Sequence, residues 1–265
     1  MIDCNTFIGN WAFRRLRNND AAGLLAMMDT FGITRACVAS ADAILYKDCH
    51  SGNIKLLEET PGHGDRFWLY ATLNPAYAGW QRDLDQCVQW GFRCVRMYPH
   101  YHGYDLAGKE AASLIDAAAE AGLPVSIPGR IVDVRQRHWM DTGENLDPLT
   151  VLRTARKHPD TCFVLTEFIV NWPRDSEHWA IARDLRWYVE LSRMTAALDK
   201  NLQVLVDTLG EERVLLGTGY PFKTPSPAFL KLRILDISEA AKSRIAGKNA
   251  QAIFGLDVDK AHGGV

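Results

Sequence analysis

The sequence predicts an α/β protein that folds as a single (β/α)8 TIM barrel. Short β-rich runs alternate with longer amphipathic runs along the whole chain, and this alternation is typical of a parallel sheet. The chain has 265 residues, and barrels of this kind commonly contain about 250. An open, doubly wound sheet is the alternative, but the sequence lacks the glycine-rich phosphate turns G-x-G-x-x-G and G-x-x-x-x-G-K-[ST] that would favour it.

The first half of the chain contains four strand–helix repeats. The strands are predicted at Met1–Phe7, Ala36–Ser40, Phe67–Asn74 and Phe92–Tyr98. The helices that follow them are predicted at Asp20–Phe31, Gly52–Glu59, Gly79–Trp90 and Gly108–Ala121. Gly32 and Gly122 stand directly after two of these helices, where glycine readily adopts the left-handed conformation that ends a helix.

The second half repeats the alternation four more times. Its strands are predicted at Val125–Pro128, Cys162–Phe168, Trp187–Ser192 and Val214–Gly217. Its helices are predicted at Pro148–Lys157, Glu177–Leu185, Asn201–Leu209, Pro227–Leu232 and Glu239–Phe254. We expect one domain over residues 1–256, followed by a C-terminal tail at 257–265.

Composition excludes several classes of partner. The 30 basic and 32 acidic residues give a net charge of −2, which argues against strong attraction to nucleic acid or to anionic membranes. Six cysteines without a Cys-x-x-Cys pair, and no signal-like N-terminus, favour reduced thiols in the cytoplasm. No apolar stretch approaches the ~18 residues of a membrane helix. We expect a small-molecule ligand, and leave a homo-oligomer open.

Six segments, in the same order along nearly the whole chain, resemble one known family. They are the N-terminal IDCNTFIG, then GFRCVRMYP, LPVSIPG, FVLTEF, VLLGTGYPF and the closing KNAQAIFGL. These runs are similar to blocks of the amidohydrolase superfamily, in particular to its branch of small metal-dependent hydrolases, decarboxylases and lactonases. The resemblance implies a TIM barrel and a hydrolase or lyase activity.

The chain departs from this family where the family binds metal. The resemblance places metal ligands at five positions that here hold Asn5, Phe7, Pro128, Glu167 and Gly219. Catalytic zinc sites usually have three protein ligands with nitrogen, sulfur or carboxylate donors, and of these five residues only Glu167 is a strong one. We therefore expect no metal and no other cofactor at this position. A substitute metal site at the His-x-His pair of His100 and His102 stays open.

Active sites of TIM barrels lie at the carboxyl ends of the strands. Alternation along the strands predicts that Arg96 and Glu167 point into the barrel, and that Thr166 points outward. We expect Glu167 and His102 to share acid–base catalysis, while Arg96 holds or polarises a carboxylate or carbonyl. The residues predicted to bind substrate are Asn5, Trp11, Arg14, Asn74, His100, Tyr104, Arg130 and Trp172.

Two interpretations of function stand at this point. In the first, the protein is a metal-independent hydrolase or lyase of a small, polar, anionic substrate such as a lactone, a sugar acid or a carboxylated ester. In the second, it is an inactive amidohydrolase-like barrel that binds a ligand or a partner. Under the second interpretation Arg96 and Glu167 form an internal ion pair, and Phe7 fills the former metal space.

Overall fold

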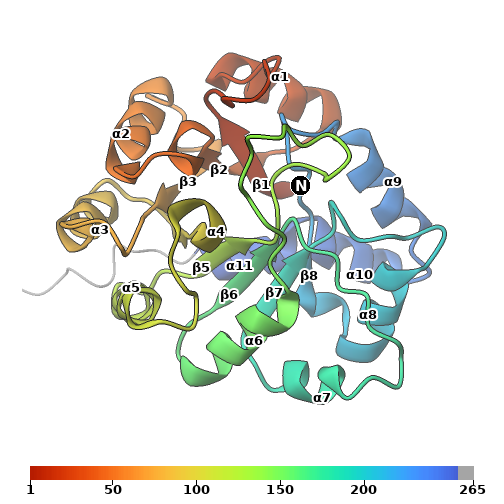
Figure 1. Ribbon diagram of the computed structural model, residues 1–265. Helices are drawn as coiled ribbons and strands as arrows, with labels where there is room; N and C mark the ends of the chain where they lie inside the picture. The colour runs from red at the N-terminus through yellow and green to blue at the C-terminus, as the bar shows by residue number, and fades with distance from the viewer. Residues whose placement is uncertain (256–265) are drawn as a thin grey trace, which may run out of the picture.

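The computed structural model describes residues 1–255, and its parallel strands form a barrel ringed by helices (Figure 1). The predicted tail at 257–265 and the last residue of the predicted domain lie outside the described residues. The strands follow one another around the barrel in sequence order: β1 (Ile2–Ile8), β2 (Arg35–Ser40), β3 (Phe67–Thr72), β4 (Cys94–Arg96), β5 (Val125–Pro128), β6 (Phe163–Thr166), β7 (Trp187–Glu190) and β8 (Val214–Leu215). The predicted fold class is confirmed.

The barrel closes between the last strand and the first. The amide of Cys4 donates to the carbonyl of Leu216 at 2.8 Å, and the amide of Phe7 donates to that of Tyr220 at 2.8 Å. These bonds leave no free sheet edge on either side of β1. The segment that follows β8 is thereby fixed against β1 at the mouth of the barrel.

The helices form the outer layer. They are α1 (Ala21–Phe31), η1 (Asp42–Ile44), α2 (Cys49–Glu59), α3 (Trp80–Gln89), α4 (Pro99–His102), α5 (Lys109–Glu120), α6 (Pro148–Lys157), α7 (His178–Arg183), α8 (Asn201–Leu209), η2 (Glu211–Arg213), α9 (Ser226–Ile234), α10 (Glu239–Ser243), η3 (Arg244–Lys248) and α11 (Asn249–Phe254). Asp20 caps α1 by accepting from the amide of Gly23 at 2.7 Å, and Gly32 ends it with φ 67°. The predicted bounds of β5, α6 and α8 match the structure.

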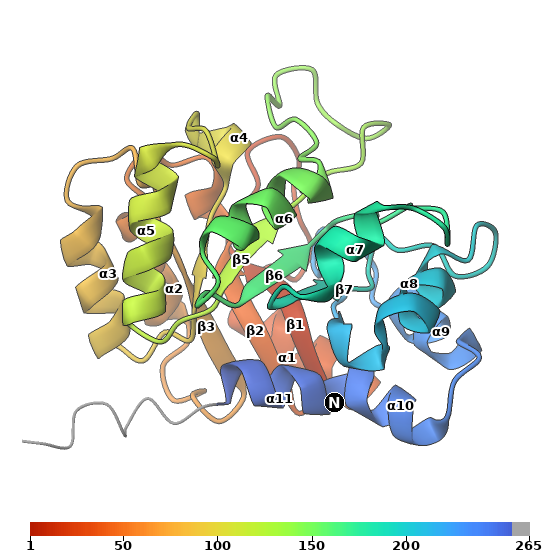
Figure 2. The same ribbon diagram turned by 90° about the horizontal axis from the view of Figure 1, so that it is seen from below.

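The two ends of the barrel differ. Figure 2 shows α10 and α11 across one end, where Phe254 of α11 packs on Tyr70 with ring centroids 5.5 Å apart. At the other end lie α4 and the long segment between β5 and α6, which extends beyond the strands. This second end holds the carboxyl ends of the strands and is the barrel mouth. Among the described residues, no helix is long and apolar enough to cross a membrane.

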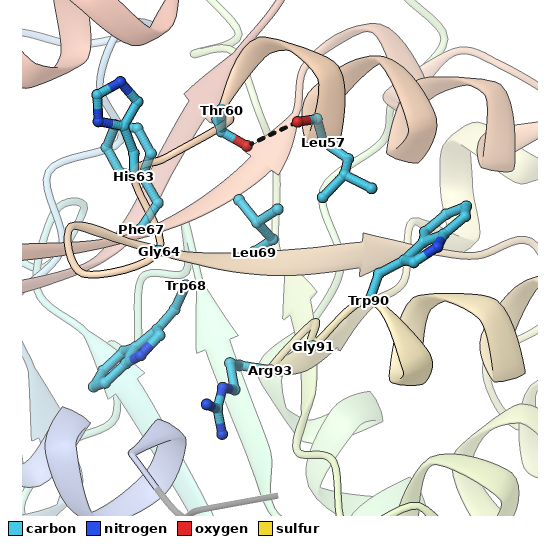
Figure 3. A pocket seen from close by; sticks show the side chains of 10 residues that line it. All are labelled: Leu57, Thr60, His63, Gly64, Phe67, Trp68, Leu69, Trp90, Gly91 and Arg93. Carbon is cyan, nitrogen blue, oxygen red and sulfur yellow. Dashed lines mark hydrogen bonds between the residues drawn. The ribbon is translucent and has the colours of Figure 1, made fainter. Parts of the chain in front are cut away.

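A hollow of about 240 Å³ lies on the side of the barrel near the amino end of β3 (Figure 3). Its lining includes Trp68, Trp90 and His63, and Thr60 at its rim bonds the carbonyl of Leu57. Because the chemistry of TIM barrels takes place at the opposite ends of the strands, we place the candidate site at the mouth.

Candidate active site at the barrel mouth

Glu167 is the first residue after β6, and its backbone is left-handed, with φ 59°. This conformation is uncommon for residues other than glycine. Thr166 faces the barrel interior, because its hydroxyl accepts a hydrogen bond from Arg96 Nη1 at 3.0 Å. The prediction that Thr166 points outward is therefore wrong. Glu167 nevertheless points inward as predicted, because its left-handed backbone interrupts the alternation of the strand.

Three of the predicted site residues are linked inside the mouth. Asn5 Nδ2 donates to Glu167 Oε1 at 2.8 Å, and Arg96 Nη2 donates to Asn5 Oδ1 at 3.3 Å. Arg96 is fully buried, and its guanidinium lies 5.0 Å from the ring of Tyr70 and 5.6 Å from that of Phe7. Asn5 thus joins Arg96 to Glu167, and the two charged groups make no direct ion pair among the described residues.

Two cations that the sequence analysis missed bind the other oxygen of Glu167. Arg193 Nε donates to Glu167 Oε2 at 2.7 Å, and the ammonium of Lys223 pairs with the same oxygen. Arg193 lies three residues after the end of β7, and Lys223 lies in the longer segment between β8 and α9, eight residues after the end of β8. Their positions after two strands were the available signal, but the resembled motif after β8 ends at Phe222, one residue before the lysine.

A second carboxylate, that of Glu190, accepts hydrogen bonds from the backbone and side chains around Glu167 and Lys223. Glu190 Oε1 accepts from the amide of Glu167 at 2.7 Å and from the hydroxyl of Ser192 at 2.7 Å. The hydroxyl of Ser192 in turn accepts from Lys223 Nζ at 2.6 Å. Lys223 is therefore held between a carboxylate and a hydroxyl that is itself bonded to a second carboxylate.

Burial and charge act in opposite directions on these groups. Burial raises the pKa of Glu167, but Lys223 and Arg193 together lower it below its ordinary value. Burial raises the pKa of Glu190, and the nearby charge of Glu167 adds to the effect. Burial lowers the pKa of Lys223, although Glu167 and Glu190 oppose that change. At neutral pH Glu167 is thus an anion, and the pKa of Glu190 lies above its ordinary value.

The absence of a side chain at Gly219 makes room for the group. A Cβ atom there would lie 2.5 Å from Glu167 Oε1 and 3.2 Å from Cδ of Lys223. Gly219 also has φ 72°, a conformation that favours glycine. Glycine at this position therefore allows the carboxylate of Glu167 and the stem of Lys223 to meet.

The histidines and Tyr104 after β4 lie in a different environment. Pro99–His102 forms the short helix α4 rather than a loop. His102 Nε2 lies 3.3 Å from the carbonyl of Ala43 and 3.6 Å from Cys49 Sγ, and burial lowers its pKa to about 4. His100 and Tyr104 each have a buried polar atom without a hydrogen-bond partner among the described residues. No hydrogen bond in the described part of the chain joins His102 to Glu167 or Arg96.

Aromatic side chains fill the part of the mouth next to Phe7. Phe7 meets Phe222 edge to face at 5.1 Å, and Trp11 meets Phe222 at 5.4 Å and Tyr101 at 6.1 Å. Arg14 Nη2 donates to the carbonyl of Phe222 at 2.8 Å. Trp11 and Arg14 thus connect the first loop to the segment after β8.

Of the remaining predicted residues, only Arg130 lies beside Glu167. The two help to line a cavity of about 130 Å³, which also includes Asn145 and Phe168. Asn74 Nδ2 bonds the carbonyl of Lys47 at 3.4 Å. Trp172 packs against Trp179 with ring centroids 4.9 Å apart, so it belongs to the packing of α7.

A family model described as amidohydrolase matches residues 6–256, nearly the whole chain. The chain belongs to the amidohydrolase family. This confirms the resemblance found in the sequence.

Solved structures of other proteins have the same fold. One is 5-carboxyvanillate decarboxylase from Sphingomonas paucimobilis, with a TM-score of 0.72, 18% identity, and coverage of 96% of this chain and 98% of that one. Another is dihydroxybenzoic acid decarboxylase from Polaromonas sp. JS666, solved with manganese and 2-nitroresorcinol, with a TM-score of 0.72, 16% identity and 97% coverage of both chains.

The similarity to a curated protein is more local. A stretch of 64 residues is 39% identical to 2-amino-3-carboxymuconate-6-semialdehyde decarboxylase from Dictyostelium discoideum. It spans 23% of this chain and 18% of that protein. The activity of this amidohydrolase is therefore argued from its own site.

The residues of this amidohydrolase do not fit the divalent metal that its family implies. Both oxygens of Glu167 already accept hydrogen bonds, and two cations lie against one of them. Phe7, Pro128 and Gly219 have no donor side chains. Within residues 1–255, no cluster of three or more His, Cys, Asp or Glu side chains is arranged to hold a metal ion. The ammonium of Lys223 and the guanidinium of Arg193 instead neutralise Glu167.

Proposed function

We propose that this protein is a metal-independent lyase or hydrolase that acts on a small carboxylate at the barrel mouth. The observation that carries the proposal is the pairing of Glu167 with Lys223 and Arg193. These side chains supply positive charge at the strand ends, where a TIM barrel performs its chemistry.

The charge balance at the mouth favours an anionic substrate. Arg96, Arg130, Arg193 and Lys223 are cationic. The carboxylates paired with them, Glu167 and Asp133, both have lowered pKa values. Burial raises the pKa of a third carboxylate, Glu190, and the four cations outnumber the three carboxylates. A substrate carboxylate would therefore balance the surplus of positive charge, and arginine binds carboxylates well through its planar fork of donors. The decarboxylase names of the structural neighbours agree with a carboxylate substrate.

Within the proposal Arg96, Glu167 and His102 keep the kinds of role that the sequence predicts, and Arg193 is added to them. Arg96 and Arg193 hold the carboxylate, and Arg130 borders the cavity beside Glu167. Glu167, as an anion, accepts protons rather than donating them. His102, with its pKa of about 4, is an uncharged ring at neutral pH, so it would act as a base or hydrogen-bond acceptor.

A barrel that only binds a ligand is the second candidate. The observation that favours it is the packing of Phe7, Trp11 and Phe222 in the mouth. These rings reduce the space next to Glu167, and the cavity of about 130 Å³ there is smaller than the roughly 300 Å³ or more of most ligand pockets. Binding of a carboxylate without turnover would favour this candidate.

The test uses protein dialysed against a chelator. Binding of benzoate, acetoacetate and a lactone panel is measured by calorimetry, and turnover by product release. Arg193→Met should weaken carboxylate binding about tenfold or more, because it removes a buried charge partner. Arg135→Met is the matched control, since Arg135 bonds Asp133 but its side chain is 87% exposed. Failure of every carboxylate to bind, or binding and turnover that require added manganese or zinc, would refute the proposal.

A further inference from the structure

We propose that Lys223 is an imine-forming catalytic residue, and that the substrates are 3-oxo carboxylates that lose CO2. This inference rests on the proposed function and names its chemistry. The supporting observations are the bonding of Lys223, its exposure, and the glycine beneath it.

The amine of Lys223 is placed between two groups that can take and return its protons. Its ammonium pairs with Glu167 Oε2 and donates to Ser192 Oγ at 2.6 Å. The hydroxyl of Ser192 donates to Glu190 Oε1 at 2.7 Å. A lysine becomes a nucleophile when an adjacent base removes its proton or when burial and neighbouring cations lower its pKa. Burial does lower the pKa of Lys223, and Arg193 acts in the same direction.

Lys223 is also more accessible than the two charged residues beside it, Arg193 and Glu167. Its side chain is 22% exposed, compared with 7% for Arg193 and 1% for Glu167. The side chain of Lys223 is therefore more open to solvent than the carboxylate with which it pairs.

Gly219 gives the lysine its path to Glu167. A Cβ atom at this position would lie 3.2 Å from Cδ and 3.3 Å from Cε of Lys223. Position 219 is one of the five at which the resemblance places a metal ligand, and here its missing side chain leaves space for the stem of Lys223. In this proposal the ammonium of Lys223 stands where the resemblance would place a metal ion.

The reaction balances without any further reagent. The neutral Nζ adds to the ketone carbon after Glu167 takes a proton from the ammonium, and loss of water gives the protonated imine. The bond between the α-carbon and the carboxylate then breaks, CO2 leaves, and the electron pair moves toward the iminium nitrogen to form an enamine. The enamine carbon takes up a proton, and water releases the ketone and the free amine. The sum is one 3-oxo acid anion and one proton giving one ketone and CO2.

The experiment traps the imine on the intact protein with sodium borohydride in the presence of acetoacetate. Peptide mapping should show one reduced adduct per chain, on Lys223, with the mass of an isopropyl group or of the uncleaved acid. Lys242 is the internal control, because it too is paired with a glutamate, Glu239, and its side chain is 20% exposed. An adduct on Lys242, on Lys231, whose amine donates to the carbonyl of Leu191 near the site, or on no lysine at all would overturn the proposal.

Lys223→Arg keeps the positive charge beside Glu167 but cannot form an imine. It should retain carboxylate binding and lose both the adduct and the catalysed release of CO2 from acetoacetate. Retained catalysis in this variant would disprove the imine. If the parent protein binds carboxylates but gives no adduct, the imine fails while the proposed function stands; if it binds none, both fail. Peptide mapping on the parent protein decides the matter even if the variant does not fold.

Discussion

At the scale of single residues, the site depends on two neighbouring positions with unusual backbone conformations. Glu167 has φ 59° and Gly219 has φ 72°. The first turns a carboxylate into the mouth, and the second leaves space for it. Both contributions come from the backbone, so substitutions at these positions act on the site through geometry as well as through charge.

Gly219→Ala tests this arrangement. The new Cβ would lie 2.5 Å from Glu167 Oε1, and the left-handed conformation adds strain of about 1–2 kcal/mol. Gly122→Ala is the control, because Gly122 has φ 69° and a Cβ added there would meet nothing within 4 Å. In urea denaturation, we expect Gly219→Ala to lose at least about 1 kcal/mol more than Gly122→Ala. Equal losses of unfolding free energy in the two variants would mean that the side chain of Glu167 can move away from the new Cβ without destabilising the protein.

Asp3 predicts a pH dependence of stability. Burial raises its pKa from 3.8 to about 7, even though Thr218 and the amide of Asn5 hydrogen bond to it. The folded protein therefore keeps a proton that the unfolded chain releases. The resulting stability is complete below pH 3.8 and is lost as the pH rises to about 7.

Asp3→Asn removes this titration. Between pH 5 and 8 the parent protein should lose roughly 2–3 kcal/mol more of its unfolding free energy than Asp3→Asn does. The exposed Asp85→Asn should follow the parent. Parallel curves for the parent and Asp3→Asn would show that Asp3 is already ionised in the folded protein at low pH.

At the scale of elements, the mouth is built from loops that meet through aromatic rings. Trp11 from the first loop is 5% exposed and contacts Phe222, in the segment after β8, and Tyr101, in the short helix α4. Trp139, on the long segment after β5, is 86% exposed. The same residue type thus has a packing role in one loop and little contact in the other.

Substituting these two tryptophans should separate the roles. Trp11→Ala should lower the unfolding free energy by about 3–5 kcal/mol, because it leaves a cavity among packed rings. Trp139→Ala should change it by less than about 0.5 kcal/mol. Chemical denaturation with fluorescence detection measures both. A small effect of Trp11→Ala would show that the mouth loops are held by other contacts.

Strand six shows where sequence reasoning reaches its limit. The location of the strand was predicted correctly, but the predicted direction of the Thr166 side chain was wrong. The prediction from alternation assumes an extended backbone up to Glu167. The left-handed backbone at Glu167 violates that assumption. No residue type in Phe163–Phe168 is one that would predict a left-handed conformation at this position. Lys223 and Arg193 were missed for a related reason: a lysine or arginine after a strand is ordinarily solvated, and only tertiary contacts reveal that these two converge on one carboxylate.

At the scale of the whole molecule, the order of the eight strands could be predicted, because each strand–helix repeat has its own hydrophobic pattern and the length leaves room for one barrel. The first and last residues of short strands such as β8, which has two residues, are harder to predict, because pairing with the adjacent strands determines where they end. The resemblance to amidohydrolases also gave the fold correctly. Its metal chemistry, however, does not match the side chains that fill the mouth.

The whole protein should therefore be indifferent to divalent metals. We expect elemental analysis of the purified protein to find less than one equivalent of zinc or manganese, and chelator to leave the melting temperature unchanged. A ligand present at a hundred times its dissociation constant would stabilise the fold by about 2.7 kcal/mol, so tight metal binding would be visible. A fall in melting temperature after chelation, reversed by manganese or zinc, would contradict this.

The contact between Gly219 and Glu167 also constrains the evolutionary history open to this sequence. A metal-binding side chain introduced at position 219 alone would place its Cβ 2.5 Å from Glu167 Oε1. A change of this sequence toward a metal-binding mouth would therefore first have to replace Glu167 and thereby release Lys223. The first substitution would remove the pairing of Glu167 with Lys223 before a metal site had formed. The change would therefore pass through a protein that has neither site. Descendants are therefore expected to diversify around the lysine.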